Sequence, residues 1–247
     1  MNDFVELLNV VTTDSRDNGE VFTVTNRISV IEKLLETTDY KLVVNEPLVR
    51  LYSKRNICEG DTVVLVSSHA DSLYEACFCR DEGEFLRGTF DNSLTNAAIL
   101  SLMLQGALPD NVVVAFTGDE EHDSQGAVQT VLALGRMGCV IKFAVVLDVT
   151  NTGWEGGACL ALENDLGVDL LTAHRIVETV DSVGVKYEFK HDAEPDESWD
   201  YNDYGIPALS LCVPVNGDLH SDKGVHLCKK SLTPYMEALS VVLNILT

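Results

Sequence analysis

Short apolar runs recur along the chain and predict the strands of a sheet. Four of them are rich in β-branched residues and are bounded by polar or turn residues, a pattern typical of buried strands in a parallel sheet. These four runs occupy residues 61–68, 112–116, 143–147 and 208–213. Weaker strand patterns occupy residues 41–45, 49–53, 73–80, 158–162 and 185–189.

Between the strands, apolar residues recur at the spacing of an α-helix. Helices are predicted at residues 3–11, 25–35, 94–104, 125–137, 166–180 and 232–246. Two segments are expected to be irregular: residues 191–203, with six carboxylates and two aromatic side chains, and residues 216–225. Since strands alternate with helices, the pattern predicts a single α/β domain, residues 1–247, with a largely parallel sheet.

Composition limits the partners of such a domain. Hydrophobic residues make up 46% of the 247 residues, which is enough for a sizeable core. The formal net charge is −22, whereas nucleic acids and anionic membranes select basic surfaces. We therefore expect no nucleic-acid partner and no membrane partner. The charge suits metal cations or substrates with a free amine.

Targeting and cysteine patterns favour a cytoplasmic protein. No apolar run approaches the roughly 20 residues that span a membrane. The N-terminal region lacks the basic stretch and long apolar core of a secretory signal. The seven cysteines are odd in number and show no CxxC spacing, so we expect reduced thiols rather than a disulfide framework.

Carboxylates and histidines follow the ends of the predicted buried strands. The densest group directly follows the strand at 112–116 and comprises Asp119, Glu120, Glu121 and Asp123. His69 and Asp71 follow the strand at 61–68, Asp148 follows the strand at 143–147, and His220 comes seven residues after the strand at 208–213. Asp91 lies at the start of the helix at 94–104. Parallel strands place their carboxyl ends at one edge of the sheet, so we expect these side chains to converge there.

Two histidines and several carboxylates at one edge form a ligand set for borderline divalent metals, zinc above all. The number of ligands suits two ions, with one bridging carboxylate and with one histidine and one further carboxylate for each ion. Two ions about 3.5–4 Å apart polarise a carbonyl and generate hydroxide near neutral pH. One carboxylate must remain as general base, and Glu120 is placed for this role because its side chain diverges from that of Glu121.

Five short motifs occur in order along the chain: HAD at 69–71, FDN at 90–92, FTGDEE at 116–121, LDVT at 147–150 and LHSD at 219–222. In this order, each at a strand end or a helix start, they make the chain resemble the co-catalytic zinc exopeptidases. That family includes single-domain metallo-aminopeptidases of the bacterial leucyl aminopeptidase and glutamyl-aminopeptidase groups. The resemblance implies the zinc-exopeptidase (phosphorylase/hydrolase-like) fold, with three α/β/α layers around a mixed, mostly parallel central sheet.

The resemblance also implies a role for each matching residue. Asp91 bridges the two metals, His69 and Asp148 complete one site, and Glu121 and His220 complete the other. Asp71 orients His69, and Glu120 is the catalytic general base. The implied cofactors are two divalent ions, zinc first, with cobalt or manganese as alternatives.

The substrate pocket is expected at the acidic segment 192–203. Relatives often carry an Asp-containing substrate loop there, and Glu197 is nearest to that position. A free α-amine is expected to be held by carboxylates of this segment. Trp199, Tyr201 or Tyr204 is expected to wall the pocket for the side chain.

Two departures from the family pattern bear on the site and on the assembly. Where relatives have glycine soon after the acidic pair, this chain has His122, which is expected to face solvent. Only 21 residues separate His69 from Asp91, so the domain that some relatives insert there is absent. We therefore expect a monomer or a small homo-oligomer rather than the large shells that some relatives build.

The leading hypothesis is a zinc-dependent aminopeptidase that cleaves peptides with a free N-terminus. A carboxypeptidase or an amide deacylase would use the same metals but needs a cation for the substrate carboxylate. The cations near the motifs are Arg80, Arg87 and Lys223. A glutaminyl-cyclase-like enzyme and a non-catalytic metal- or peptide-binding module are further alternatives, and the intact set including Glu120 argues against the last.

Overall fold

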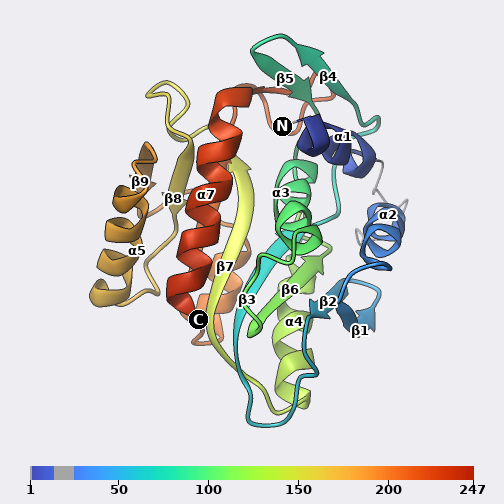
Figure 1. The fold of residues 1–247 in the computed structure, drawn as a ribbon, viewed down its shortest axis with the longest axis vertical. Coiled ribbons are helices and arrows are strands. Elements are labelled where there is room, and N and C mark those ends of the chain that lie inside the picture. The colour runs from blue at the N-terminus through green and yellow to red at the C-terminus, as the bar shows by residue number, and fades with distance from the viewer. Residues whose placement is uncertain (1, 14–24) are drawn as a thin grey trace.

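The computed structural model describes residues 2–13 and 25–247 (Figure 1). The helices are α1 (Asn2–Val11), α2 (Thr25–Leu35), α3 (Ser93–Leu104), α4 (Gln125–Arg136), α5 (Leu170–Ser182), α6 (Glu197–Asp203) and α7 (Lys229–Leu246). The strands are β1 (Lys41–Glu46), β2 (Val49–Ser53), β3 (Thr62–His69), β4 (Cys79–Glu82), β5 (Phe85–Gly88), β6 (Val112–Thr117), β7 (Val140–Thr150), β8 (Leu160–Glu163), β9 (Tyr187–Lys190), β10 (Ala208–Pro214) and β11 (Val225–Cys228). The four predicted buried strands correspond to β3, β6, β7 and β10.

The main sheet has the strand order β1-β2-β6-β3-β7-β10-β8-β9. Its central strands β6, β3, β7 and β10 run parallel to one another, and β9 runs parallel to β8. The remaining neighbours, β1 with β2, β2 with β6, and β8 with β10, are antiparallel. The predicted mixed, mostly parallel central sheet is therefore confirmed, and the carboxyl ends of the four central strands share one edge.

Helices cover both faces of this sheet (Figure 1). On one face, α3 and α7 pack with Val64 and Val66 of β3. On the same side, α1 packs against α3 and α5 packs against α7. On the other face, α4 and α6 pack with Val63 and Leu65 of the same strand. Because successive strand residues point to opposite faces, a strand buried on both sides is apolar throughout, as the sequence pattern indicated. The predicted three-layer α/β/α architecture is confirmed.

Three segments differ from the predicted pattern. The strand expected at residues 73–80 is replaced by β4 and β5, which form a separate three-stranded sheet with β11. β11 begins at the end of the segment 216–225 that was expected to be irregular. Residues 191–203 contain α6, because the side chain of Asp196 accepts a hydrogen bond from the backbone N–H of Ser198 and caps the helix.

The connection from β3 to α3 holds only the β4–β5 hairpin and turns, so no further domain is inserted there. The hairpin is tied to the start of α7, where the backbone N–H of Lys229 donates to the Glu84 carbonyl at 3.0 Å. Within the described residues, none of the helices combines the length and the apolar character needed to cross a lipid bilayer.

Candidate metal centre

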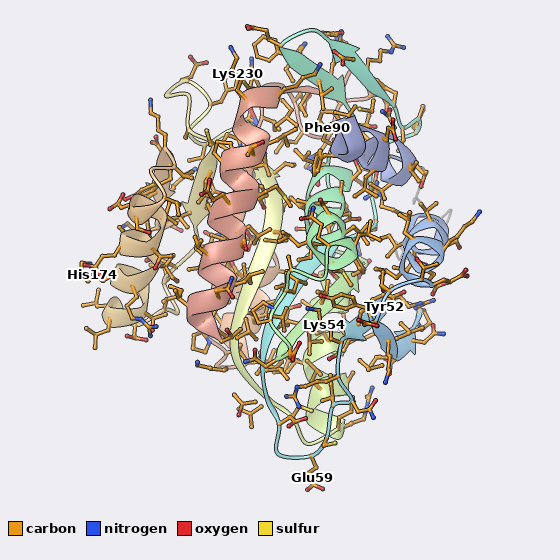
Figure 2. The ribbon with its side chains drawn as sticks, viewed as in Figure 1. Tyr52, Lys54, Glu59, Phe90, His174 and Lys230 are labelled. Atoms are coloured by element: carbon orange, nitrogen blue, oxygen red, sulfur yellow. The ribbon has the colours of Figure 1, made fainter. Side chains whose placement is uncertain are left out.

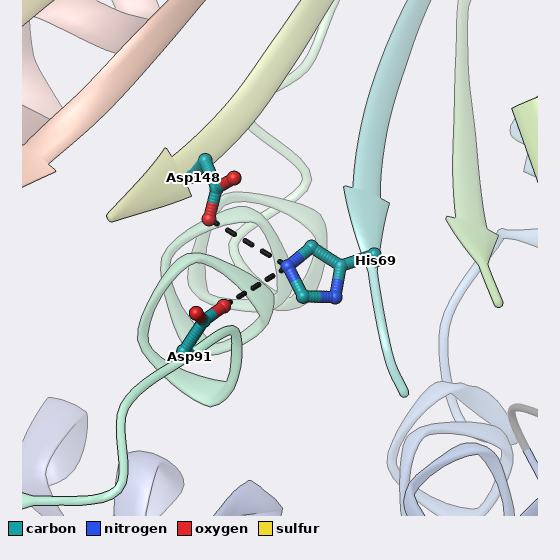
Figure 3. A group of neighbouring side chains, drawn as sticks. All are labelled: His69, Asp91 and Asp148. Atoms are coloured by element: carbon teal, nitrogen blue, oxygen red, sulfur yellow. Dashed lines mark ion pairs between the residues drawn. The ribbon is translucent and has the colours of Figure 1, made fainter. Parts of the chain in front are cut away.

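His69, Asp91 and Asp148 meet at the carboxyl edge of the central sheet (Figure 3). His69 ends β3, Asp148 lies near the end of the neighbouring strand β7, and Asp91 lies two residues before α3. Nε2 of His69 lies 3.0 Å from Oδ1 of Asp91 and 3.6 Å from Oδ1 of Asp148. Three residues that are far apart in the sequence thus face one point.

Amide side chains at the start of α3 fix Asp91 in this position. Nδ2 of Asn96 donates to the His69 carbonyl at 2.8 Å and ties the helix to the end of β3. Nδ2 of Asn92 donates to the Leu147 carbonyl at 2.8 Å and ties the residue after Asp91 to β7. Both acceptors are backbone carbonyls at strand ends, so the start of the helix is held between β3 and β7.

The turn after β6 carries Glu120 and Glu121 to the same edge. The chain turns through Asp119, whose φ of 65° lies in the left-handed region. It then enters α4, where the backbone N–H of Gly126 donates to the Gly118 carbonyl at 3.0 Å. A Cβ atom at Gly126 would lie 2.5 Å from that carbonyl oxygen, so a side chain there would prevent a turn this tight.

A second group forms around the other oxygen of Asp91. Nε2 of His220 lies 3.6 Å from Oδ2 of Asp91 and 3.6 Å from Oε2 of Glu121. His220 comes from the loop between β10 and β11 and its side chain is 57% exposed, whereas that of Glu121 is 3% exposed. Asp91 therefore faces His69 with one carboxylate oxygen and His220 with the other.

Both groups have the donor types and the spacing of a zinc site. The candidate ligand atoms of each group lie within 4.8 Å of one another. Tetrahedral zinc with bonds of about 2.0–2.2 Å keeps its ligand atoms roughly 3.3–3.6 Å apart, close to the observed distances between the histidine and carboxylate atoms. His69 Nε2, Asp91 Oδ1 and Glu121 Oε1 are buried without a hydrogen-bond partner in the part of the chain described. Since buried polar atoms are normally paired, this donor set fits a cation.

The carboxylates of the centre repel one another in the metal-free protein. Burial, reinforced by the charge of Asp91, raises the pKa of Glu121 to about 8. Burial also raises the pKa of Asp148 to about 6 and that of Glu120 well above its ordinary value. For Asp91 burial acts in the same direction, but the close contacts with His220 and His69 lower the pKa overall. A divalent cation would offset this repulsion.

Asp71 lies behind His69 and is fully buried. Its Oδ1 lies 3.3 Å from Nδ1 of His69, the ring nitrogen that points away from Asp91. Such a contact fixes the imidazole with its other nitrogen facing the ligand cluster. Oδ2 of Asp71 accepts a hydrogen bond from the backbone N–H of Glu121 at 3.3 Å, a link that the sequence did not predict.

A cavity of about 470 Å³ opens over the centre. At one end its wall is formed by Asp91, Glu120, Glu121, Asp148 and His220, and at the other end by Glu163, Lys190, Glu194 and Asp196. Oε2 of Glu120 lies 3.7 Å from Nε2 of His69, so this carboxylate borders both the first group and the open space. His122, which was expected to face solvent, is about half exposed but also lines the cavity.

The three residues predicted to bind substrate do not line this cavity. Tyr201 is fully buried, and its hydroxyl donates to Oγ of Ser67 at 2.9 Å. Oγ of Ser67 in turn donates to Oε2 of Glu197 at 2.7 Å. Trp199 is 41% exposed and packs beside residues 164–167 instead. These positions follow from the helix: Glu197 and Tyr201, four residues apart in α6, face the core together, and Trp199 lies on the opposite side.

Two parts of the site were missed by sequence reasoning. Arg27 of α2 is fully buried, and the charges of Asp71, Asp91 and Glu121 oppose the lowering of its pKa by burial. No sequence signal connects this helix to the centre. The far end of the cavity was also missed, although Asp196 followed by a polar stretch is a recognisable helix-start signal.

A histidine beside a carboxylate is not by itself a candidate metal site, and His174 is an example. This histidine projects from the outer side of α5 (Figure 2), and its side chain is 66% exposed. Its Nε2 lies 3.2 Å from the carboxylate of Glu178, one helical turn further on. A histidine–carboxylate pair on an exposed helix has water for its remaining partners, whereas the pairs at the strand ends are buried.

Comparison with known proteins agrees with this geometry. The sequence model of peptidase family M28 matches residues 49–232, and no curated protein matches the chain. In fold the chain is similar to a TET aminopeptidase from the marine sediment archaeon Thaumarchaeota archaeon SCGC AB-539-E09 (11% identity, 100% of each chain, TM-score 0.78). It is also similar to the TET1 peptidase of Pyrococcus horikoshii (14% identity, 96% of this chain and 98% of that chain, TM-score 0.74). A further similar structure is BSAP, a zinc aminopeptidase from Bacillus subtilis (16% identity, 80% of this chain and 49% of that chain, TM-score 0.59).

The family match covers the whole candidate centre. The matched region begins before β3 and ends after the loop that carries His220, so it includes all five candidate ligands and Glu120. The predicted resemblance to the co-catalytic zinc exopeptidases is thereby confirmed, as is the predicted class of metal-dependent peptidase. The chain belongs to peptidase family M28.

Proposed function

We propose that this protein is a two-metal aminopeptidase that removes the first residue from peptides with a free N-terminus. The observation that carries the proposal is the position of Asp91, whose two carboxylate oxygens face His69 and His220 in separate groups. A carboxylate between two ligand groups suits a pair of divalent ions. The family and the aminopeptidases among the similar structures support this function.

The proposed ligands divide between two ions, with His69 and Asp148 on one, Glu121 and His220 on the other, and Asp91 shared. Zinc suits these nitrogen and oxygen donors best, and cobalt or manganese are the expected substitutes. When bound, such a pair polarises a carbonyl and lowers the pKa of a coordinated water. The ordered carboxylates and imidazoles supply the negative charge and the fixed geometry that hold the ions in place.

Glu120 is the proposed general base. It belongs to neither ligand group, lines the cavity and lies beside the first group. Its carboxylate takes a proton from the attacking water and delivers one to the departing amine. Burial and neighbouring carboxylates raise its pKa in the metal-free protein, and positive charge in the two groups favours the ionised form that a base requires.

The free α-amine of the substrate is the proposed recognition element. The cavity is lined by carboxylates at both ends, and Lys190 is the only lysine or arginine among the described residues that line it. An excess of negative charge favours a bound ammonium group and disfavours a bound carboxylate. Of the segment 192–203, Glu194 and Asp196 line the cavity. Glu194 is the carboxylate proposed to contribute, because both oxygens of Asp196 already accept hydrogen bonds from serine residues.

A hydrolase that holds its substrate by a carboxylate is the second candidate. Arg80, Arg87 and Lys223, the cations expected for that role, do not line the cavity. Lys190 does, from the exposed end of β9. One exposed cation among many carboxylates supports carboxypeptidase or deacylase activity less well than aminopeptidase activity.

Peptide profiling with the zinc-loaded protein tests the proposal. Tripeptides beginning with alanine or with lysine are offered in free, N-acetylated and C-amidated forms, and the products are identified by mass spectrometry. We expect cleavage of the first bond in the free and C-amidated peptides and none in the N-acetylated peptides. Cleavage that tolerates N-acetylation, or that removes the last residue, would contradict the proposal.

We also propose a monomer or small homo-oligomer. The TET1 peptidase of Pyrococcus horikoshii can assemble into a tetrahedron or a large octahedral shell. No domain is inserted between β3 and α3 in the present chain, so a shell is not expected. Light scattering should give a mass of one or a few chains of 27.0 kDa, and a mass of many chains would contradict this.

A further inference from the structure

The end of the cavity that lies away from the metal centre has a carboxylate in its wall. Glu163 ends β8, its side chain lines the cavity, and the residue is only 5% exposed. Its backbone is paired with Ser210 of β10 and with Lys190 of β9. Glu163 is therefore positioned by the sheet and not by a loop.

The Glu163 carboxylate has neutral partners. Its Oε1 accepts a hydrogen bond from Oγ1 of Thr150 at 3.1 Å, and the thiol of Cys212 is hydrogen-bonded to it. Across the described ranges 2–13 and 25–247, no lysine, arginine or histidine nitrogen pairs with it. Burying a carboxylate is costly unless a counter-charge is near. Glu163 is thus a buried carboxylate in the cavity wall that has no cationic partner among the described residues.

The neighbouring buried carboxylate, Asp196, differs because the protein already uses both of its oxygens. Oδ1 accepts a hydrogen bond from the backbone N–H of Ser198 at 2.9 Å, and Oδ2 accepts one from Oγ of Ser210 at 2.5 Å. These bonds start α6 and tie it to β10. Of the two buried carboxylates at this end, Glu163 is the one that is available to a ligand.

The distance between Glu163 and the centre selects the length of that ligand. One partner of Glu163, Thr150, lies two residues after Asp148 on β7, which is about 6.6 Å along the strand. The other partner, Cys212, is paired in register with Asp148 on the neighbouring strand β10, about 4.8 Å away. A cationic group held by Glu163 would lie about the reach of a lysine or arginine side chain from a scissile bond beside Asp148. Shorter side chains would leave the carboxylate unpaired.

We infer that Glu163 makes the enzyme selective for peptides whose first residue is lysine or arginine. The inference rests on the proposed aminopeptidase function for the orientation of the substrate. With the scissile carbonyl at the metal centre, the first side chain extends into the remainder of the cavity. Its ammonium or guanidinium group then donates a charge-assisted hydrogen bond to the Glu163 carboxylate.

Lys190 would favour the opposite preference, an acidic first residue. Its side chain reaches the same end of the cavity, but the residue is exposed at the end of β9. A counter-charge gains little beside an ammonium group in water and much more beside a desolvated carboxylate. Because Glu163 is buried and Lys190 is exposed, we expect Glu163 to have the larger effect on which first residue binds, and a cationic side chain to be preferred.

Calorimetric titration of the zinc-loaded protein tests the inference without turnover. The probes are amino alcohols, which have no peptide bond to cleave: L-lysinol, L-norleucinol, which has the same four-carbon side chain without the ammonium group, and 4-amino-5-hydroxypentanoic acid as the acidic analogue. We expect lysinol to bind about 10- to 100-fold more tightly than norleucinol, the range of a charge-assisted hydrogen bond. The acidic analogue should bind more weakly than norleucinol.

Three variants locate the effect. Glu163→Gln keeps the size of the side chain and removes its charge, so the ratio of lysinol to norleucinol affinity should fall to near one. Lys190→Gln removes the competing cation and should raise the ratio. Glu188→Gln, at an exposed position of β9 outside the cavity, is the matched control and should keep the wild-type ratio. Circular dichroism shows whether each variant folds.

Equal binding of lysinol and norleucinol by the wild type would overturn the inference, whatever the variants do. An unchanged ratio in a folded Glu163→Gln variant would also overturn it. Tighter binding of the acidic analogue would instead assign this end of the cavity to Lys190. Selective lysinol binding without hydrolysis of any peptide would leave the inference standing and refute the proposed function.

Discussion

Two acid-rich parts of the molecule, the metal centre and the segment 192–203, resemble each other in sequence and differ in structure. At the centre, buried oxygens such as Oδ1 of Asp91 and Oε1 of Glu121 have no hydrogen-bond donor within the described residues. In the segment, Asp196 accepts hydrogen bonds from Ser198 and Ser210 and thereby starts α6. The first set of carboxylates is incomplete without a cation, whereas the second is completed by the protein.

The difference lies in the neighbours of the carboxylates. At the ends of β3, β6 and β7, most backbone N–H groups are already used by the sheet. At the start of α6, backbone N–H groups and serine hydroxyls are free to donate. The number of carboxylates in a segment therefore does not identify a binding site, and the supply of donors around them does.

The largest effect is expected from Asp91→Ala, which removes the carboxylate that both groups share. We expect both ions to be lost and kcat/KM to fall by about 10⁴-fold or more, because the ions stabilise the transition state by several kcal/mol. Metal analysis and peptide hydrolysis on the same sample check this. Asp192→Ala removes an exposed carboxylate of the segment and should change neither quantity. An Asp91→Ala variant that keeps one ion at full affinity would show that Asp91 is not shared.

Glu120 and Glu121 are adjacent, and their conservative variants separate base from ligand. Glu120→Gln should lower kcat by about 10²–10⁴ with little change in metal content, since general-base catalysis is lost in the transition state. Glu121→Gln should weaken metal binding in the group of His220 first. The paired measurement is metal stoichiometry and kcat for both variants. If Glu120→Gln loses an ion and Glu121→Gln keeps both, then Glu120 is the ligand and Glu121 is the base.

Glu197 provides a test in the segment 192–203, because its carboxylate is buried in the core and accepts a hydrogen bond from Ser67. Burial raises its pKa to about 7, from about 4.5 in the unfolded chain. The folded state then binds more protons between these values, so this group makes stability fall as pH rises, by about 3 kcal/mol from pH 4.5 to above 7. Glu197→Gln should remove that slope and keep both ions. Urea unfolding of the metal-loaded proteins at several pH values measures this pH dependence of the free energy of unfolding. The same pH dependence in the wild type and in Glu197→Gln would show that Glu197 is not its source.

Metal removal should have a smaller effect on stability. At a free ion concentration of 100 times Kd, one site contributes about 2.7 kcal/mol to the free energy of unfolding. In a chain of this size that corresponds to a rise in Tm of about 5–10 °C. Chelation should lower Tm in the wild type and leave Asp91→Ala unchanged. Because Asp148 and Glu121 must lose protons to bind metal and have pKa values of about 6 and about 8, affinity should fall as pH is lowered through this range.

Local patterns were sufficient to predict the centre of the fold. β3, β6, β7 and β10 are apolar throughout because they are buried on both faces, and this property is visible in the sequence itself. Parallel strands that share an edge then bring together the polar residues that follow them. The order of the five motifs therefore predicted which side chains the structure gathers.

Residues brought to the site by packing alone could not be predicted in this way. Arg27 comes within electrostatic range of Asp71 and Asp91 because α2 packs on α3. Glu163 reaches the cavity because β8 joins β10 in antiparallel orientation. Neither contact leaves a periodic or spacing signal. The positions of Trp199 and Tyr201 outside the cavity were not foreseen for a related reason, since a two-turn helix such as α6 is too short to show helical periodicity clearly.

The central claim is that Asp91 joins two separate cation sites, and a zinc titration of the metal-free protein tests it most directly. The wild type should bind two ions per chain at saturation. Asp148→Asn, which weakens the group of His69, and His220→Ala, which weakens the other group, should each lose one ion and keep the second. Two ions in the wild type with one in each variant is the predicted result. One ion or none in the saturated wild type, or loss of the same ion in both variants, would contradict the account.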